Sequence, residues 1–143
     1  MKKILVTLAT LFSSQCFSAG NIQALQGRFQ VNASRCTSFK STPAHAFISA
    51  RSSDSLLVEF LGSEAREIIV HVEDGEDVSR NGRESYVSRW SNNNSVTSTR
   101  TYIKDDGKSV TEVITLTSTA TGVLLNQVVD GKEAMTCEMT RKK

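Results

Sequence analysis

The sequence is poor in the residues on which most catalytic and metal sites depend. It holds two histidines, one proline, one tryptophan and three cysteines, and only 6% of its residues are aromatic. His45 and His71 belong to no His-x-x-x-His pattern and no Cys-x-x-Cys pair occurs, so no zinc site is indicated. A Gly-x-Ser-x-Gly elbow and a glycine-rich phosphate loop are also missing. We therefore expect a non-enzymatic protein with no metal and no cofactor.

One charged segment has part of the pattern of a calcium-binding loop. Residues 77–82 place oxygen-bearing side chains at alternate positions before a glycine, as the first half of a calcium loop does. Ser88 stands where such a loop needs a bidentate glutamate, and Arg80 and Arg83 would oppose a cation. We expect residues 74–83 to form a polar hairpin loop instead.

The sequence also lacks an excess of charge of one sign and a long hydrophobic run. The formal net charge is +2, and loss of Lys2 and Lys3 with the amino-terminal segment leaves equal numbers of basic and acidic residues. Binding to nucleic acid or to an anionic membrane is therefore not expected, because both need an excess of positive charge. No stretch has the length and hydrophobicity of a membrane span.

The first 20 residues have the features of a bacterial-type secretory signal peptide. Lys2 and Lys3 form its basic region, residues 4–12 its short apolar core, and residues 13–20 its small polar end. We expect residues 1–20 to be removed and residues 21–143 to form one domain. The protein is then periplasmic or secreted.

The cleavage point remains open between two positions. Cleavage after Gly20 puts Ser18 at position −3, and cleavage after Ser18 puts Cys16 there, and both residues are small. Cleavage after Ala19 would put the bulky Phe17 at that position. The prediction adopted here is cleavage after Gly20.

The cysteines predict a disulfide. Cys16 is unlike a lipid-attachment site because Gln15 precedes it, and it is expected to leave with the signal peptide. Cys36 and Cys137 then remain in an oxidising compartment, where an even pair is usually bonded; two free thiols are the alternative. A crosslink that closes a loop of about 100 residues contributes roughly 4.7 kcal/mol in the chain-entropy model.

Alternation of apolar and polar residues predicts strands along the whole mature chain. Residues 21–25 suggest one helical turn, and Gly27 opens the first strand, with Phe29 and Val31 on one face. The further predicted strands are residues 46–51, 56–61, 67–73, 84–90, 95–104, 109–119, 123–129 and 132–139. Asp130-Gly131 between the last two is a strong hairpin signal, because a type I′ turn needs positive φ at both central residues.

Short strands joined by polar turns predict an all-β fold, a single antiparallel meander barrel of about eight to nine strands. The disulfide would hold the first and last strands side by side and so hide both sheet edges. A β-sandwich is the alternative. An outer-membrane barrel is disfavoured, since one tryptophan cannot form an aromatic girdle.

Gly27-Arg28-Phe29 at the start of the first strand, followed by a meander and a late cysteine, resembles lipocalin-like barrels. In that family a glycine, any residue and a tryptophan open the first strand; here Phe29 takes the place of tryptophan. The resemblance implies a closed barrel that holds a small apolar ligand.

Two functions are considered. The first is an exported, non-enzymatic carrier of a small apolar ligand, with Phe47, Phe60, Trp90 and Tyr102 as candidate ligand-binding residues; each also fits an ordinary core role. The second is a protein-binding module, such as an inhibitor or a surface interaction domain that binds an envelope protein. Its candidate surfaces are the charged segment 74–83 and the threonine-rich strand 95–104.

Overall fold

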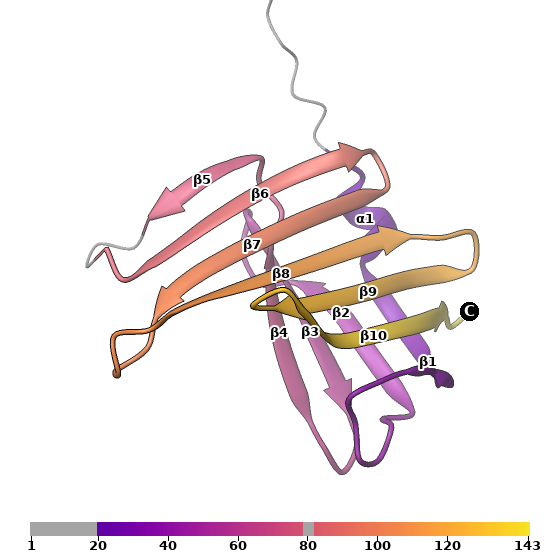
Figure 1. Ribbon diagram of the computed structural model, residues 1–143. Helices are drawn as coiled ribbons and strands as arrows, with labels where there is room; N and C mark the ends of the chain where they lie inside the picture. Colours follow the sequence, from indigo (N-terminus) through magenta and orange to yellow (C-terminus); the bar gives the residue numbers. More distant parts are fainter. Residues whose placement is uncertain (1–19, 79–81) are drawn as a thin grey trace, which may run out of the picture.

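The computed structural model of the protein describes residues 20–78 and 82–143, in which ten antiparallel strands form one sheet (Figure 1). The predicted signal segment 1–19, with Cys16, and residues 79–81 of the charged loop lie outside the described residues. A four-residue helix, α1 (Ile22–Leu25), precedes the strands. The strands are β1 (Gly27–Cys36), β2 (His45–Ala50), β3 (Ser55–Leu61), β4 (Arg66–His71), β5 (Gly75–Val78), β6 (Glu84–Asn92), β7 (Ser95–Ile103), β8 (Ser109–Ser118), β9 (Gly122–Val129) and β10 (Lys132–Arg141). No helix in the described part of the chain is long and apolar enough to span a membrane.

The strand order confirms the predicted antiparallel meander. The sheet runs β4-β3-β2-β1-β10-β9-β8-β7-β6-β5, so every strand except β1, β4, β5 and β10 pairs with its two neighbours in sequence. The first and last strands pair in the middle of the sheet, where Cys36 lies opposite Cys137 and is bonded to it. The two ends of the folded chain are therefore joined by both a ladder and a disulfide.

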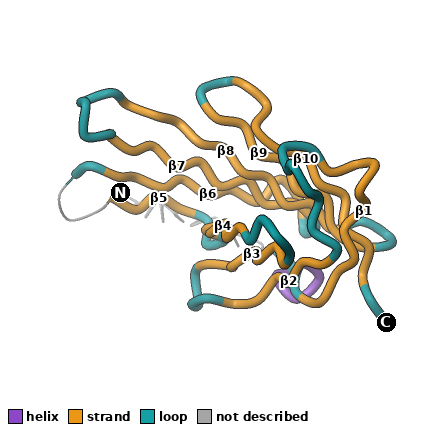
Figure 2. Tube along the Cα trace, turned by 90° about the horizontal axis from the view of Figure 1, so that it is seen from below, coloured by secondary structure: helices purple, strands orange, loops and turns teal. Residues whose placement is uncertain are grey.

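The sheet curls into a half-barrel whose edges do not meet, which corrects the expectation that no edge is left open. β4 and β5 are the two edge strands and make no ladder with each other. Figure 1 shows β4 descending away from β5 and β6, and Figure 2 shows β2–β4 on one side of the molecule and β7–β9 on the other. Charged side chains on the inner face of β6–β8 account for the opening, because closing the sheet over them would remove them from water.

β5 is the one strand that the sequence did not predict. Residues 74–83 were expected to form a single polar loop, but Gly75–Val78 pairs with β6, with Gly75 opposite Ser88 and Glu76 opposite Val87. The composition of this segment carries no strand signal. An extended backbone alone satisfies the ladder, so pairing with β6 overrides the low strand propensity.

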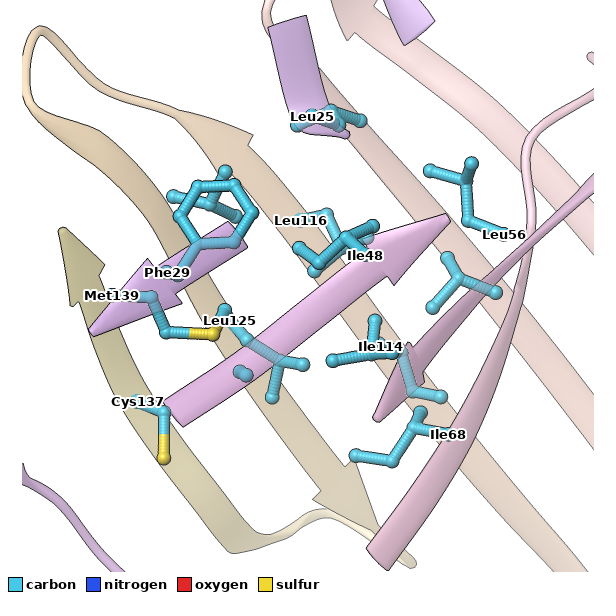
Figure 3. Close-up of a cluster of buried hydrophobic side chains, with 14 of the residues drawn as sticks. Leu25, Phe29, Ile48, Leu56, Ile68, Ile114, Leu116, Leu125, Cys137 and Met139 are labelled. Atoms are coloured by element: carbon cyan, nitrogen blue, oxygen red, sulfur yellow. The ribbon is translucent and has the colours of Figure 1, made fainter. Parts of the chain in front are cut away.

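The core lies between the two halves of the sheet and shows the predicted period of two. Leu56, Val58 and Phe60 of β3 are buried in one cluster with Leu116 of β8 and Leu125 of β9, and Figure 3 labels Leu56, Leu116 and Leu125 in this cluster. Each buried aliphatic or aromatic side chain contributes about 1.5–3 kcal/mol relative to exposure. The core cluster draws on residues from α1 and from strands on both sides of β1, including β3, β4, β8 and β9.

The hairpin between β9 and β10 has the predicted turn. Asp130 has φ of 49° and Gly131 has φ of 77°, which are the two positive values that a type I′ turn requires. Lys132 pairs with Val129 directly after the turn. The ladder then shifts by one residue between Glu133 and Met135, and this irregularity places Cys137 opposite Leu125 on the inner face.

Candidate ligand-binding site

A partly open cavity of about 420 Å³ lies where β4 and β6 diverge, and we call it the gap cavity. Its walls come from the edge strand β4 on one side and from the inner face of β6–β9 on the other. Ile68 and Ile114 give it an apolar wall that continues the core. The lining residues are Arg66, Glu67, Ile68, Ile69, Tyr86, Arg100, Glu112, Ile114 and Gln127.

The floor of the gap cavity is a row of polar residues across three strands. Tyr86 of β6 pairs with Arg100 of β7, and Arg100 pairs with Glu112 of β8. Because cross-strand partners share a face, all three side chains point inward. The rest of this face is apolar along β8, where Ile114 and Leu116 are buried. The polar row therefore marks where the core ends and the cavity begins.

Arg100 is the centre of this row. Its Nε donates to Glu84, and its Nη1 lies 3.7 Å from Glu112 Oε2. The guanidinium also lies 4.6 Å from the ring centroid of Tyr102 and 5.9 Å from that of Tyr86. Burial, the largest single effect, lowers the pKa of Arg100, but the hydrogen bond that Arg100 donates to Glu84 and the charges of Tyr86, Glu84 and Glu112 together raise it overall. Arg100 is therefore a fixed positive charge held between two carboxylates.

The same contacts shift the pKa values of Glu84 and Tyr86. The Tyr86 hydroxyl donates to Glu84 Oε1 at 2.5 Å, and this bond, followed by those from Arg100, lowers the pKa of Glu84. Burial and the hydrogen bond to Glu84 raise the pKa of Tyr86 to about 12. Gln127 donates its amide to Glu112. Together with Glu84, the row therefore holds one guanidinium, two carboxyl side chains and a neutral phenol.

A second, more acidic hollow of about 280 Å³ adjoins the gap cavity across Tyr86. The His71 and Tyr86 rings lie 3.8 Å apart between their centroids and separate the two hollows. Beyond them the lining residues are Asp54, Glu73, Asp74, Gly75, Glu76 and Ser88. Asp54 has a lowered pKa because Ser52 donates to it. Among the described residues, no group of three or more His, Cys, Asp or Glu has metal-binding geometry.

The structure separates the four aromatic residues that the sequence singled out. Phe60 is 1% exposed in the core, 5.1 Å from the Phe39 ring. Phe47 lies on the outer face of β2, with the Arg28 guanidinium 5.4 Å from its ring centroid. Neither therefore reaches the gap cavity.

The other two lie nearer to it. Trp90 donates from Nε1 to Val72 O at 2.7 Å and from its backbone to Asp74 Oδ1 at 2.8 Å, and these bonds hold β6 against the segment between β4 and β5. Tyr102 lies two residues from Arg100 on the same face of β7, and its ring contacts the Arg100 guanidinium. None of the four is among the described residues that line the cavity; Tyr102 contacts Arg100 of the lining, and Phe60 is the cross-strand partner of Arg66.

Sequence reasoning missed the polar row, although a signal for it was present. Tyr86, Arg100 and Glu112 each lie an even number of residues from an inward-facing apolar residue on the same strand: Trp90, Val96 and Ile114. A charged residue in the phase of buried neighbours indicates either a strand end or a site. The predicted ligand-binding residues were all aromatic core candidates, so the polar row was not among them.

Comparison with known proteins assigns the chain to no family. No protein-family model matches the sequence, and no curated protein matches it. Among solved structures, the chain is similar to "As-p18, an extracellular fatty acid binding protein", with a TM-score of 0.47 and 11% sequence identity, over 86% of this chain and 99% of that chain. The antiparallel meander in which Gly27 opens β1 agrees with the resemblance to lipocalin-like barrels in strand order, whereas the closed barrel that the resemblance implied is not present.

Proposed function

We propose that the protein is an exported, non-enzymatic binder of a small amphipathic molecule, which it holds in the gap cavity. The observation that carries this proposal is the polar row at the base of a cavity with isoleucine walls. A volume of about 420 Å³ lies within the range of small-molecule sites, which combine apolar walls with a few placed polar groups. The apolar part of the ligand packs on Ile68 and Ile114, and its polar head reaches Arg100, Glu112 and Gln127.

The titratable groups of the cavity support binding rather than catalysis. Tyr86 donates a hydrogen bond to Glu84, and Arg100 pairs with both Glu84 and Glu112. Glu112 also accepts a hydrogen bond from Gln127. Groups held in this way keep one charge state and one orientation, which favours recognition of a head group. The open edge at β4 gives the ligand a route that leaves the core intact.

The test is a titration of the purified protein with amphipathic molecules that share one alkyl chain and differ in head group, followed by calorimetry and native mass spectrometry. We expect binding at one site. Arg100→Met removes a charged hydrogen-bonding group worth about 1.5–3 kcal/mol, so affinity falls roughly 10- to 150-fold. Arg89→Met is the matched control, since Arg89 is an exposed residue of β6 that donates to Gly75 O.

A second variant keeps the test informative if Arg100→Met does not fold. Gln127→Leu removes the amide that donates to Glu112 without changing charge, and it is also expected to weaken binding. Saturable binding that neither variant alters would place the ligand elsewhere. Absence of binding across the whole panel would refute the proposal.

The alternative function is recognition of an extended peptide by the edge strand β4. An edge strand offers unpaired N–H and C=O groups that can accept a further strand. Ile69 on this strand is 38% exposed and is available to a partner side chain. Recovery of one stoichiometric envelope protein, lost on Ile69→Lys and kept on the control Ile103→Lys, would favour this function over ligand binding.

A further inference from the structure

The ionic groups at the base of the gap cavity are already paired with one another. The Arg100 guanidinium donates from Nε to Glu84, and its Nη1 lies 3.7 Å from Glu112 Oε2. Glu84 also accepts a hydrogen bond from the Tyr86 hydroxyl at 2.5 Å, and Glu112 accepts one from the Gln127 amide. Each carboxyl group is therefore served by the guanidinium and by one neutral donor.

These pairs are partly shielded from water, which makes them costly to break. The side chain of Glu112 is 16% exposed and that of Glu84 is 29% exposed. A charged group that loses its partner in such a place regains little hydration in return. An anionic head group at Arg100 would compete with both carboxyl groups, and a cationic head group at Glu112 would lie beside the guanidinium. A ligand ion therefore either breaks a pair or faces a like charge.

The wall on β4 carries opposite charges that do not belong to the polar row. β4 contributes Arg66 and Glu67 to the lining, next to each other in the chain. The Arg66 guanidinium lies 4.7 Å from the ring centroid of Phe39 and donates to Ser38 O at 3.4 Å, so it is held by the loop after β1. Glu67 is exposed. The head group of a ligand that reaches the row thus meets ion pairs there and no added charge of one sign.

The polar row still offers hydrogen bonds. A guanidinium has five N–H donors, more than the two contacts of Arg100 with the carboxyl groups require. Gln127 gives its amide N–H to Glu112, and its carbonyl oxygen can accept a further hydrogen bond. Arg100 is 41% exposed along its side chain, so a ligand can reach it. Because a hydroxyl both donates and accepts, as an amide group does, either kind of head group matches this set.

We propose that the gap cavity selects an amphiphile with an uncharged head group that carries hydroxyl or amide groups, and that it discriminates against carboxylate and ammonium head groups alike. The head group exchanges hydrogen bonds with Arg100 and Gln127 while the ion pairs stay intact. The apolar chain packs on Ile68 and Ile114, which both belong to the core cluster (Figure 3). This inference rests on the proposed function, because it names the class of ligand for the same cavity.

The test compares amphiphiles that share a decyl chain, by calorimetry at neutral pH and below their micelle concentrations. Decyl glucoside and decanamide are uncharged, decanoate is an anion and decyltrimethylammonium is a cation. We expect the uncharged pair to bind roughly ten-fold tighter or more than either ion, because only the ions disturb a partly buried ion pair. Equal or tighter binding of decanoate or decyltrimethylammonium would overturn this inference and leave the proposed function standing. Absence of binding by all four would refute the proposed function itself.

A variant tests whether the ion pairs are the cause of this selection. Glu112→Gln keeps an oxygen for the Gln127 amide and releases Arg100 from one of its two carboxyl partners. We expect the affinity for decanoate to rise roughly ten-fold. Glu133→Gln, at an exposed position of β10, removes the same formal charge outside the cavity and should leave all four affinities unchanged.

Two results of this variant would contradict the inference. Affinity for decanoate that is unchanged in Glu112→Gln would show that the ion pairs do not exclude anions. An equal rise in both variants would show an effect of overall charge and no role for the polar row. The ranking measured with the natural sequence decides the proposal by itself should Glu112→Gln not fold.

Discussion

The disulfide between Cys36 and Cys137 is expected to provide a large part of the stability of the fold. The β1–β10 ladder pairs Phe29 with Arg141 and Val31 with Met139, but its register is interrupted between Val31 and Cys36. The disulfide therefore holds the end of β1 that the ladder holds least. The bonded residues are 101 positions apart, and a loop of about 100 residues corresponds to roughly 4.7 kcal/mol. That is comparable to the whole net stability of a small domain.

The perturbation is the double variant Cys36→Ala/Cys137→Ala, measured by urea unfolding. We expect the free energy of unfolding to fall by about 4–5 kcal/mol and, with a slope of about 1–3 kcal/mol per molar urea, the midpoint to fall by roughly 1.3–5 M. Reduction of the wild-type protein should reproduce this loss. The same reductant should have no effect on the double variant, which serves as its control.

A loss below about 1 kcal/mol would refute the reasoning. It would mean that the backbone contacts beside the disulfide suffice, in which the Thr37 amide donates to Thr136 O at 2.8 Å and the Thr136 amide donates to Thr37 Oγ1 at 2.9 Å. Hydrogen exchange distinguishes the two cases. Faster exchange confined to residues 32–37 and their partners in β10 would show that the bond secures this end alone.

Three further predictions concern other parts of the fold. Phe60→Ala should cost about 3–5 kcal/mol of unfolding free energy, whereas Phe47→Ala on the outer face should cost clearly less, by the same urea assay. Tyr86 has its pKa raised to about 12, so its contribution to stability is present below pH 10 and is lost as the pH rises to 12; Tyr86→Phe should abolish that loss, as followed by the pH dependence of the melting temperature. Gly131→Ala should cost about 1 kcal/mol, because Gly131 has positive φ, and an unchanged midpoint would contradict the assigned turn.

The local pattern of the sequence was sufficient to predict every strand except β5, and with it the inward face of strands such as β3. In β3, Leu56, Val58 and Phe60 alternate with less buried residues because one face of the strand meets the core. The same reasoning predicted the turn at Asp130-Gly131, where backbone geometry limits the residues that fit. These features depend on neighbours within a few positions, so the sequence carries them directly.

Features that depend on distant segments were not predictable in this way. β5 exists because β6 offers it a ladder, and the opening beside β4 exists because charged groups from β6 and β8 occupy the inner face. The candidate site combines Ile68 with Arg100 and Glu112, which are brought together only by the curl of the sheet. Single-strand patterns show the inward phase of each residue but not which inward residues meet.

The pairing of β1 with β10 makes the chain a circularly shifted version of a simpler one. If Lys143 were linked to Asn21 and the chain were opened between β4 and β5, the strands would follow one another along the chain in the same order as in the sheet. Every ladder would then be a hairpin between sequential neighbours, and the mean sequence separation of contacts would fall. Folding rates rise as that separation falls, so this permuted chain should fold faster than the natural one to the same structure.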